Sequence, residues 1–248
     1  DPVGVWECWS LLAALAASTT RIALGPFVSC ANYRNPALLA KIAETVDEIS
    51  GGRLILGLGA GDFAEEHYTH GMRWDHRVSR FAETLAIVHP LLRQGRVDFA
   101  GEYEQARECE LRPRGPQLAG PPLLIGALAN RPRMLELTAR YADAWNGWVV
   151  GGRSHADVVA PMREAVDAAC LVVGRDPATL ERTLAIAVAL KKRAIWGAEP
   201  VSGSAEEVAE ALLGFAREGI SHVQVFLNPA TAEGIAEMAA VLDHLDRG

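Results

Sequence analysis

The chain alternates between segments with helical periodicity and short apolar runs of strand length. In the helical segments, apolar residues recur every three or four positions, which places them on one face of an α-helix. The first such helix is predicted to begin at Asn35-Pro36, an N-cap followed by proline, and to stop at Gly51-Gly52. The four apolar stripes are Leu39, Ile42, Val46 and Ile49; Val78, Phe81, Leu85, Val88 and Leu92, before Gly95; Val208, Leu212 and Phe215, after a Ser204/Glu207 capping box; and Ile235, Met238, Leu242 and Leu245.

Apolar runs of strand length lie between these helices. They cover residues 22–28, 53–58, 123–127, 144–149, 184–189 and 223–227. Nearly continuous apolar runs are typical of strands that are covered on both faces, as in parallel sheets. One longer interruption, 96–122, is rich in proline, glycine and charge. This α/β alternation indicates either a doubly wound sheet or a (β/α)₈ TIM barrel.

The barrel is favoured because no composition break divides the chain, so we expect one domain over residues 1–248. Polar and glycine residues also follow the apolar runs directly, at the strand ends where barrels carry their sites. These residues are Ser29-Cys30-Ala31-Asn32, Gly59-Ala60-Gly61-Asp62, Leu128-Ala129-Asn130, Lys191-Lys192 and Asn228-Pro229. A barrel has eight strands, and the chain starts at Asp1 without Met. We therefore expect the first strand, its helix and the second strand to be missing from this sequence.

Composition narrows the class of protein. The 248 residues are 50% hydrophobic and 22% charged, which is typical of a globular chain. The longest unbroken apolar stretch, 11–17, is too short to span a bilayer. A net charge of −7 disfavours nucleic acid as a partner. The four cysteines are far apart and form no CxxC pair, so we expect a reducing, cytoplasmic setting.

The glycine-rich segment Gly57-Leu58-Gly59-Ala60-Gly61-Asp62 follows a predicted strand. It is not a dinucleotide fingerprint, because Asp62 stands where the third glycine should be. The glycines would either let the backbone approach a flat ligand or pack a tight turn. Asp62 would either transfer protons at a barrel mouth or cap the helix that follows.

A second candidate site is the turn after the predicted strand 123–127. The sequence Gly126-Ala127-Leu128-Ala129-Asn130 leads into a helix that Asn130 would cap. Free N–H groups at such a helix start can bind phosphate, and Arg131 or Arg133 would add positive charge. The turn lacks the Lys-Ser/Thr of a nucleotide-hydrolysing P-loop, and an ordinary capped helix remains the alternative.

Other candidate chemistry is weaker. Glu65, Glu66, His67 and His70 lack the HExxH arrangement, so we expect no metal. Hydrolase chemistry is not favoured, because there is no GxSxG elbow and Cys30 has no evident His partner. Among the tryptophans, Trp6, Trp9 and Trp74 would wall a pocket, whereas Trp145 and Trp148 would belong to the core and the barrel rim.

Several of these segments together resemble the luciferase-like monooxygenase superfamily, and more narrowly its actinobacterial branch that uses the deazaflavin coenzyme F420. The resemblance extends over nearly the whole chain. It is carried by residues 20–25 (TRIALG), 34–41 (RNPALLAK), 50–54 (SGGRL), 57–61 (GLGAG) and 140–146 (RYADAWN).

The resemblance implies a TIM barrel that binds F420 or FMN at its C-terminal mouth. In this family a bulge with a non-prolyl cis peptide backs the ring, and here it would comprise Phe27, Val28 and Ser29. Gly59, Ala60 and Gly61 would form a wall of the ring site, with Asp62 as the proton-transfer residue. The phosphate-binding turn would comprise Gly126, Ala127, Leu128, Ala129 and Asn130.

The function implied by the resemblance is F420-dependent hydride transfer to or from a small organic substrate. The alternatives are an FMN monooxygenase that uses reduced flavin and O₂, and a non-catalytic flavin-binding relative. A flavin or F420 reductase would be a partner, and the resemblance implies a homodimer.

Overall fold

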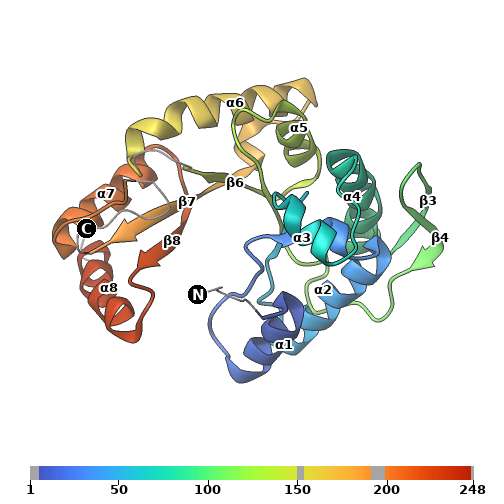
Figure 1. Cartoon of the computed structure of the whole chain (residues 1–248), viewed down its shortest axis with the longest axis horizontal. Helices are drawn as coiled ribbons and strands as arrows, with labels where there is room; N and C mark the ends of the chain where they lie inside the picture. Colours follow the sequence, from blue (N-terminus) through green and yellow to red (C-terminus); the bar gives the residue numbers. More distant parts are fainter. Residues whose placement is uncertain (1–5, 150–153, 191–198, 247–248) are drawn as a thin grey trace. The chain divides into compact units, whose positions relative to one another are not determined.

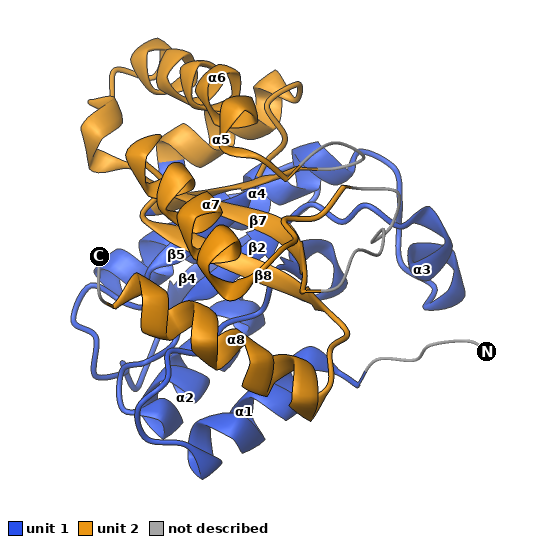
Figure 2. Ribbon diagram, turned by 90° about the vertical axis from the view of Figure 1, so that its left-hand side faces the viewer, with its two compact units in different colours: residues 1–126, 141–143 blue, residues 127–140, 144–248 orange. Residues whose placement is uncertain are grey.

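The computed structural model describes residues 6–149, 154–190 and 199–246 (Figure 1). Its contacts divide the chain into two compact units, shown in different colours in Figure 2. The first comprises Asp1–Gly126 and Tyr141–Asp143, and the second comprises Ala127–Arg140 and Ala144–Gly248. Whether 1–248 acts as a single domain stays a prediction. Within the described ranges, no helix has both the length and the apolar content that a membrane span requires.

The first unit combines three parallel strands with helices and a separate hairpin. Its strands run in the order β1-β2-β5, with Ser29 opposite Leu58 and Leu56 opposite Leu123. The helices α1 and α2 lie side by side, as do α2 and α4 (Figure 1). The elements are α1 (Cys8–Ser18), β1 (Ser29–Cys30), the 3₁₀ helix Ala31–Tyr33, α2 (Pro36–Ser50), β2 (Leu56–Gly59), α3 (Ala64–Thr69), α4 (Arg77–Gln94), β3 (Arg96–Ala100), β4 (Gln105–Glu110) and β5 (Leu123–Gly126).

The second unit repeats the parallel β/α arrangement. Its strands run in the order β6-β7-β8, with Ala144 opposite Glu181 and Thr183 opposite His222. A core that includes Leu184, Ile186 and Phe215 lies between β7 and its helices. The elements are β6 (Ala144–Trp148), α6 (Val159–Val172), β7 (Glu181–Ala189), α7 (Ala205–Arg217), β8 (His222–Asn228) and α8 (Ala232–Leu245), and α5 (Pro132–Tyr141) precedes them.

The helix boundaries predicted from caps are confirmed. Asn35 accepts a hydrogen bond from the Leu38 amide at the start of α2, and Gly51 ends that helix with φ at 69°. Gly95 ends α4 in the same left-handed conformation. The capping box of Ser204 and Glu207 is formed at the start of α7.

The strand predicted over 22–28 is wrong. Leu24 makes only an isolated bridge to Leu54, and the strand itself is Ser29–Cys30. Pro26 has no N–H to donate, so the ladder is interrupted between these two points. The neighbouring strand is likewise displaced, from the predicted 53–58 to Leu56–Gly59. The interruption at 96–122 contains the antiparallel hairpin of β3 and β4, which the composition of that segment did not indicate.

Two predicted helix faces are also corrected. On α2, Ile49 is 43% exposed, whereas Glu44 and Asp47 are buried. Arg114 and the Gly115 amide donate to Glu44, and the Gln117 side chain and the Leu54 amide donate to Asp47 Oδ1. Hydrogen bonds therefore compensate the burial of Glu44 and of one Asp47 oxygen, whereas Asp47 Oδ2 has no hydrogen-bond partner among the described residues. On α8, Ile235 and Leu242 are exposed. The inward residues are Gly234, Met238, Val241 and Leu245.

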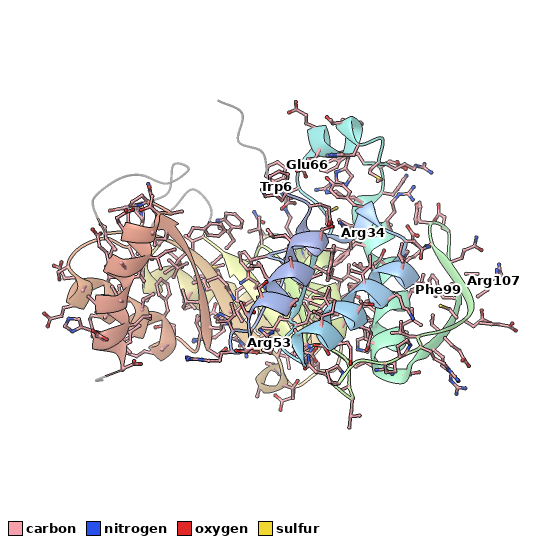
Figure 3. All side chains as sticks on the ribbon, turned by 90° about the horizontal axis from the view of Figure 1, so that it is seen from below. Trp6, Arg34, Arg53, Glu66, Phe99 and Arg107 are labelled. Carbon is pink, nitrogen blue, oxygen red and sulfur yellow. The ribbon has the colours of Figure 1, made fainter. Side chains whose placement is uncertain are left out.

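Arg53 connects α1 to the start of the parallel sheet. Its guanidinium donates to the carbonyl oxygens of Ala16, Thr19, Ile22 and Ser50 at distances of 2.6 to 2.9 Å. It also donates to Thr19 Oγ1 at 3.0 Å. Figure 3 labels Arg53 at the end of α1, where helical carbonyl groups have no partner within the helix. A single cation thus stabilises the turn that leads from α1 towards β1.

We expect Arg53→Ala to lower the free energy of unfolding by about 2–3 kcal/mol, because several carbonyl groups lose a charged donor. Urea unfolding followed by circular dichroism measures this. The matched control is Arg107→Ala, an exposed arginine of β4 (Figure 3) that makes one long side-chain hydrogen bond, to Gln105 at 3.4 Å. The control should change stability by less than about 0.5 kcal/mol. Equal losses in the two variants would contradict this role of Arg53.

Candidate functional site

The segment around β1 lies unusually close to β2. A Cβ atom added at Gly57 would lie 2.0 Å from the Pro26 carbonyl oxygen, and one at Gly59 would lie 2.9 Å from Val28 Cγ2. Gly61 has φ at 84°, and its Cβ would lie 2.7 Å from Cys30 Sγ. All three glycines are therefore required by packing within the unit, which is one of the two interpretations the sequence left open. Whether these glycines also approach a ligand stays a prediction.

The predicted ring-site residues 27–29 differ in exposure. The peptide bond between Phe27 and Val28 is cis, as the family resemblance implied. Phe27 and Val28 are 38% and 37% exposed, so both present apolar surface. Ser29 is buried, and its Oγ accepts a hydrogen bond from Trp9 Nε1 at 3.2 Å. Trp9 is therefore a core residue and not the pocket wall that the sequence predicted.

Asp62 lies in a loop whose neighbouring carbonyl groups are each bound by a side chain. Asn32 Nδ2 donates to the Ala60 oxygen at 3.0 Å, and Arg77 Nε donates to the Gly61 oxygen at 3.1 Å. His67 Nδ1 lies 3.0 Å from the Phe63 oxygen. The Asp62 side chain is exposed and makes no hydrogen bond or ion pair with any described residue.

The helix-cap interpretation of Asp62 is wrong. The next helix, α3, begins at Ala64 and its N-cap position is Phe63. A cap must occupy the residue that flanks the first turn, and Asp62 is one position too early. Its carboxylate is therefore available for other chemistry.

Cys30 has a histidine partner that the sequence did not reveal. Cys30 Sγ lies 3.7 Å from His67 Nε2, although the residues are 37 positions apart. Burial raises the pKa of the Cys30 thiol to about 11, so it stays protonated at neutral pH and is not a nucleophile. Cys30 is the last residue of β1, and His67 lies in α3, the helix that follows the neighbouring parallel strand β2. The predicted parallel strands could have indicated this pair, because the carboxyl ends of neighbouring parallel strands meet at one edge of a sheet.

His67 and its neighbours form a compact aromatic cluster. The Tyr33 hydroxyl donates to Glu66 Oε2 at 2.9 Å, and burial together with this bond raises the pKa of Tyr33. Glu66 projects from α3, as Figure 3 shows. Trp74 has its ring 4.9 Å from His67 and 4.4 Å from the Arg77 guanidinium carbon. Trp74 is thus engaged with these two side chains, while Trp6 is 85% exposed. In the ranges covered by the structure, no group of His, Cys, Asp and Glu is arranged to hold a metal.

Ala127, the residue of the predicted phosphate-binding turn with which the second unit begins, is held by two hydrogen bonds. The Ala127 amide donates to the Asn146 oxygen at 3.0 Å, and Trp145 Nε1 donates to the Ala127 oxygen at 2.9 Å. Trp145 is fully buried, as predicted, so it holds Ala127 from the core. The amides of Leu128, Ala129 and Asn130 donate to no residue in the described part of the chain.

The helix start after this turn needs one correction. The helix α5 begins at Pro132, and the Leu135 amide donates to the Arg131 oxygen at 3.0 Å, so Arg131 and not Asn130 precedes the helix. The three free amides and the first turn of α5 still form a set of donors suited to an anion. Lys191 and Lys192, also singled out by the sequence, lie outside the described residues.

Comparisons with known proteins identify the family of this chain. The sequence profile of the family described as luciferase-like monooxygenase matches residues 2–194. The chain is 36% identical over 182 residues to the phthiodiolone/phenolphthiodiolone dimycocerosates ketoreductase of Mycobacterium bovis, covering 71% of this chain and 45% of the relative. It is 32% identical over 178 residues to the F420-dependent hydroxymycolic acid dehydrogenase of Mycobacterium tuberculosis, covering 69% and 46%. The chain therefore spans about half the length of these curated relatives.

Solved structures show the same fold. A structure of an F420-dependent secondary alcohol dehydrogenase in complex with an F420-acetone adduct matches with a TM-score of 0.80 at 17% identity. The match covers 97% of this chain and 84% of that one. The luciferase-like α/β barrel class that the sequence predicted is thereby confirmed.

The close contact between β2 and the segment before β1 can be tested by adding single methyl groups. We expect Gly57→Ala to lower the free energy of unfolding by about 3 kcal/mol, because the new Cβ overlaps the Pro26 oxygen and the backbone must move. Gly126→Ala is the control, since its Cβ would lie at an ordinary 3.6 Å from Val28 Cγ2.

Thermal and urea unfolding of both variants provide the measurement. If Gly57→Ala does not fold, Gly59→Ala, whose Cβ meets only the Val28 side chain at 2.9 Å, gives the milder version. Equal stability of the Gly57 and Gly126 variants would show that β1 and β2 are not in this close contact.

Proposed function

The chain belongs to the luciferase-like monooxygenase family, and on that premise we propose that it forms an F420-dependent oxidoreductase. The reaction is hydride transfer between the deazaflavin and a small organic alcohol or carbonyl compound. The observation that carries this proposal is the exposed Asp62 carboxylate in the loop after β2. The backbone of this loop is held by Asn32, Arg77 and His67, which bind the carbonyl groups of Ala60, Gly61 and Phe63. An F420-dependent dehydrogenase among the relatives supports the choice of cofactor.

The residues present fit such a cofactor. Phe27 and Val28 offer half-exposed apolar surface suited to a flat ring, and Gly59 to Gly61 carry no side chain that would cover it. In the second unit, taken by itself, the amides of Leu128, Ala129 and Asn130, which have no partner among the described residues, fit a phosphate group. When bound, F420 supplies a ring carbon that accepts or returns hydride.

Asp62 would manage the proton that accompanies the hydride. In the direction of alcohol oxidation, an Asp62 carboxylate oxygen would accept the proton of the substrate hydroxyl group as the carbonyl product forms. In the reverse direction the protonated Asp62 returns that proton to the carbonyl oxygen. The backbone around Asp62 would fix the carboxylate relative to the reacting carbon, which is the positioning that such transfers require.

Cofactor choice is tested by fluorescence titration of the purified chain with F420 and with FMN. We expect micromolar affinity for F420 and at least roughly tenfold weaker affinity for FMN. Tighter binding of reduced FMN would instead favour a monooxygenase. Failure to bind either cofactor would contradict both enzymatic functions for this chain. The phosphate-free ribityl form of each cofactor is the control for the turn 126–130, and should bind roughly tenfold or more weakly than the phosphorylated form.

The role of Asp62 is tested by Asp62→Asn. We expect kcat for F420 reduction to fall roughly 10²-fold or more across a panel of secondary alcohols, because the amide cannot accept the proton. The dissociation constant for F420 should stay within about threefold. Glu65→Gln, which removes an exposed acid of α3 three positions away, is the matched control and should leave kcat unchanged. A fully active Asp62 variant would remove this residue from the mechanism.

A further inference from the structure

His67 is a fully buried polar side chain next to the proposed proton-transfer loop, and both of its ring nitrogens have partners. Nδ1 lies 3.0 Å from the Phe63 carbonyl oxygen, which can only accept a hydrogen bond, and 3.3 Å from the Tyr33 hydroxyl. Because the Tyr33 hydroxyl gives its hydrogen to Glu66, it too faces Nδ1 as an acceptor, and this arrangement places the ring hydrogen on Nδ1. Nε2 then carries a lone pair and accepts the hydrogen of the Cys30 thiol, whose sulfur is 3.7 Å away. These two contacts together fix the tautomer of the ring.

The same ring restrains the backbone on both sides of Asp62. On the C-terminal side it holds the Phe63 oxygen. On the N-terminal side Gly61 packs so closely that an added Cβ would lie 2.7 Å from His67 Cε1 and 2.7 Å from Cys30 Sγ. Because the Asp62 side chain has no partner of its own among the described residues, the backbone of Gly61 and Phe63 sets its direction.

Two further side chains hold the other end of the loop. Asn32 Nδ2 donates both to the Ala60 oxygen and to the Arg77 oxygen, each at 3.0 Å, and Arg77 Nε donates to the Gly61 oxygen. Neither of them reaches Phe63. His67 is therefore the side-chain donor that the structure gives to the C-terminal half of the loop.

We propose that His67 is a positioning residue for Asp62, acting through the hydrogen bond from its Nδ1 to the Phe63 carbonyl oxygen. This inference rests on the proposed function of Asp62. The Nε2 contact with Cys30 holds the ring in place but does not act on Asp62. The ring touches neither the substrate nor the cofactor in this role.

A matched pair of variants separates the two ring nitrogens. The side-chain nitrogen of asparagine can take the place of Nδ1, and that of glutamine the place of Nε2. We expect His67→Asn to keep kcat within about threefold of the original chain. His67→Gln should lower kcat roughly 10- to 100-fold, with KM and the F420 dissociation constant little changed, since misplacement of a catalytic group by about 1 Å has effects of this size.

A double-mutant cycle shows whether His67 acts through Asp62. In the Asp62→Asn background, His67→Gln should lower kcat no further, because the group it positions is already lost. A purely structural role would lower kcat by the same factor in both backgrounds. Urea unfolding of each variant corrects for any general loss of stability. Equal losses of activity in the Asn and Gln variants, with equal losses of stability, would overturn the inference.

Two measurements on the cofactor-free chain test the inference independently of turnover. Nitrogen-15 NMR should show His67 with its hydrogen on Nδ1, assigned by the signals that vanish in the His67 variants. Amide hydrogen exchange at Gly61, Phe63 and Ala64 should be roughly tenfold faster in His67→Gln and unchanged in His67→Asn. A ring with its hydrogen on Nε2 would overturn the inference. If the original chain binds no F420, the proposed function fails, whereas these two measurements still decide the role of His67.

Discussion

The close contact between β2 and the segment leading into β1 is the constraint on which the candidate site depends. A Cβ atom at Gly57, Gly59 or Gly61 would enter space that is already occupied. The atoms that occupy it are the backbone oxygen of Pro26 and side-chain atoms of Val28 and Cys30. Any side chain there would push the two segments apart. Cys30 at the end of β1 and Asn32 just after it could then no longer reach His67 and Ala60, which follow β2. Glycine at alternate positions of β2 and of the loop after it thus allows the polar contacts beyond the strand end.

The first unit repeatedly uses buried and half-buried polar side chains to hold irregular backbone. Arg53 binds the carbonyl groups after α1, and Asn32, Arg77 and His67 bind those around Asp62. Asp47 and Glu44 bind the amides of Leu54 and Gly115 in the same way. Buried backbone groups outside helices and sheets must find partners, and loops near a site cannot obtain them from a ladder. These side chains supply the partners that the loops do not obtain from a strand ladder.

The sequence predicted the elements well where one local signal dominated, as with the caps of α2, α4 and α7. It failed where long-range partners decided the outcome. Glu44 and Asp47 can be buried in α2 because a segment distant in the sequence supplies their hydrogen-bond donors. These donors are Arg114, Gly115 and Gln117. The apolar periodicity within α2 could not predict contacts with that segment. The pairing of Cys30 with His67 is similar, since it depends on two strands lying side by side. The proposed residues Asp62 and 126–130 were found because glycine and polar residues directly after a strand are a local signal.

The placement of Asp62 explains why its neighbours, and not its own side chain, carry the hydrogen bonds. A carboxylate that accepts and returns a proton needs its oxygen lone pairs free, and a bound cation or a set of donors would compete for them. A free carboxylate on a mobile loop, however, would lose the alignment that proton transfer requires. For the proposed role of Asp62, binding the carbonyl groups of Ala60, Gly61 and Phe63 meets both requirements, because it fixes the backbone and leaves the side chain unpaired among the described residues. An ion pair with Arg77 would have fixed Asp62 more directly, but at the expense of its basicity.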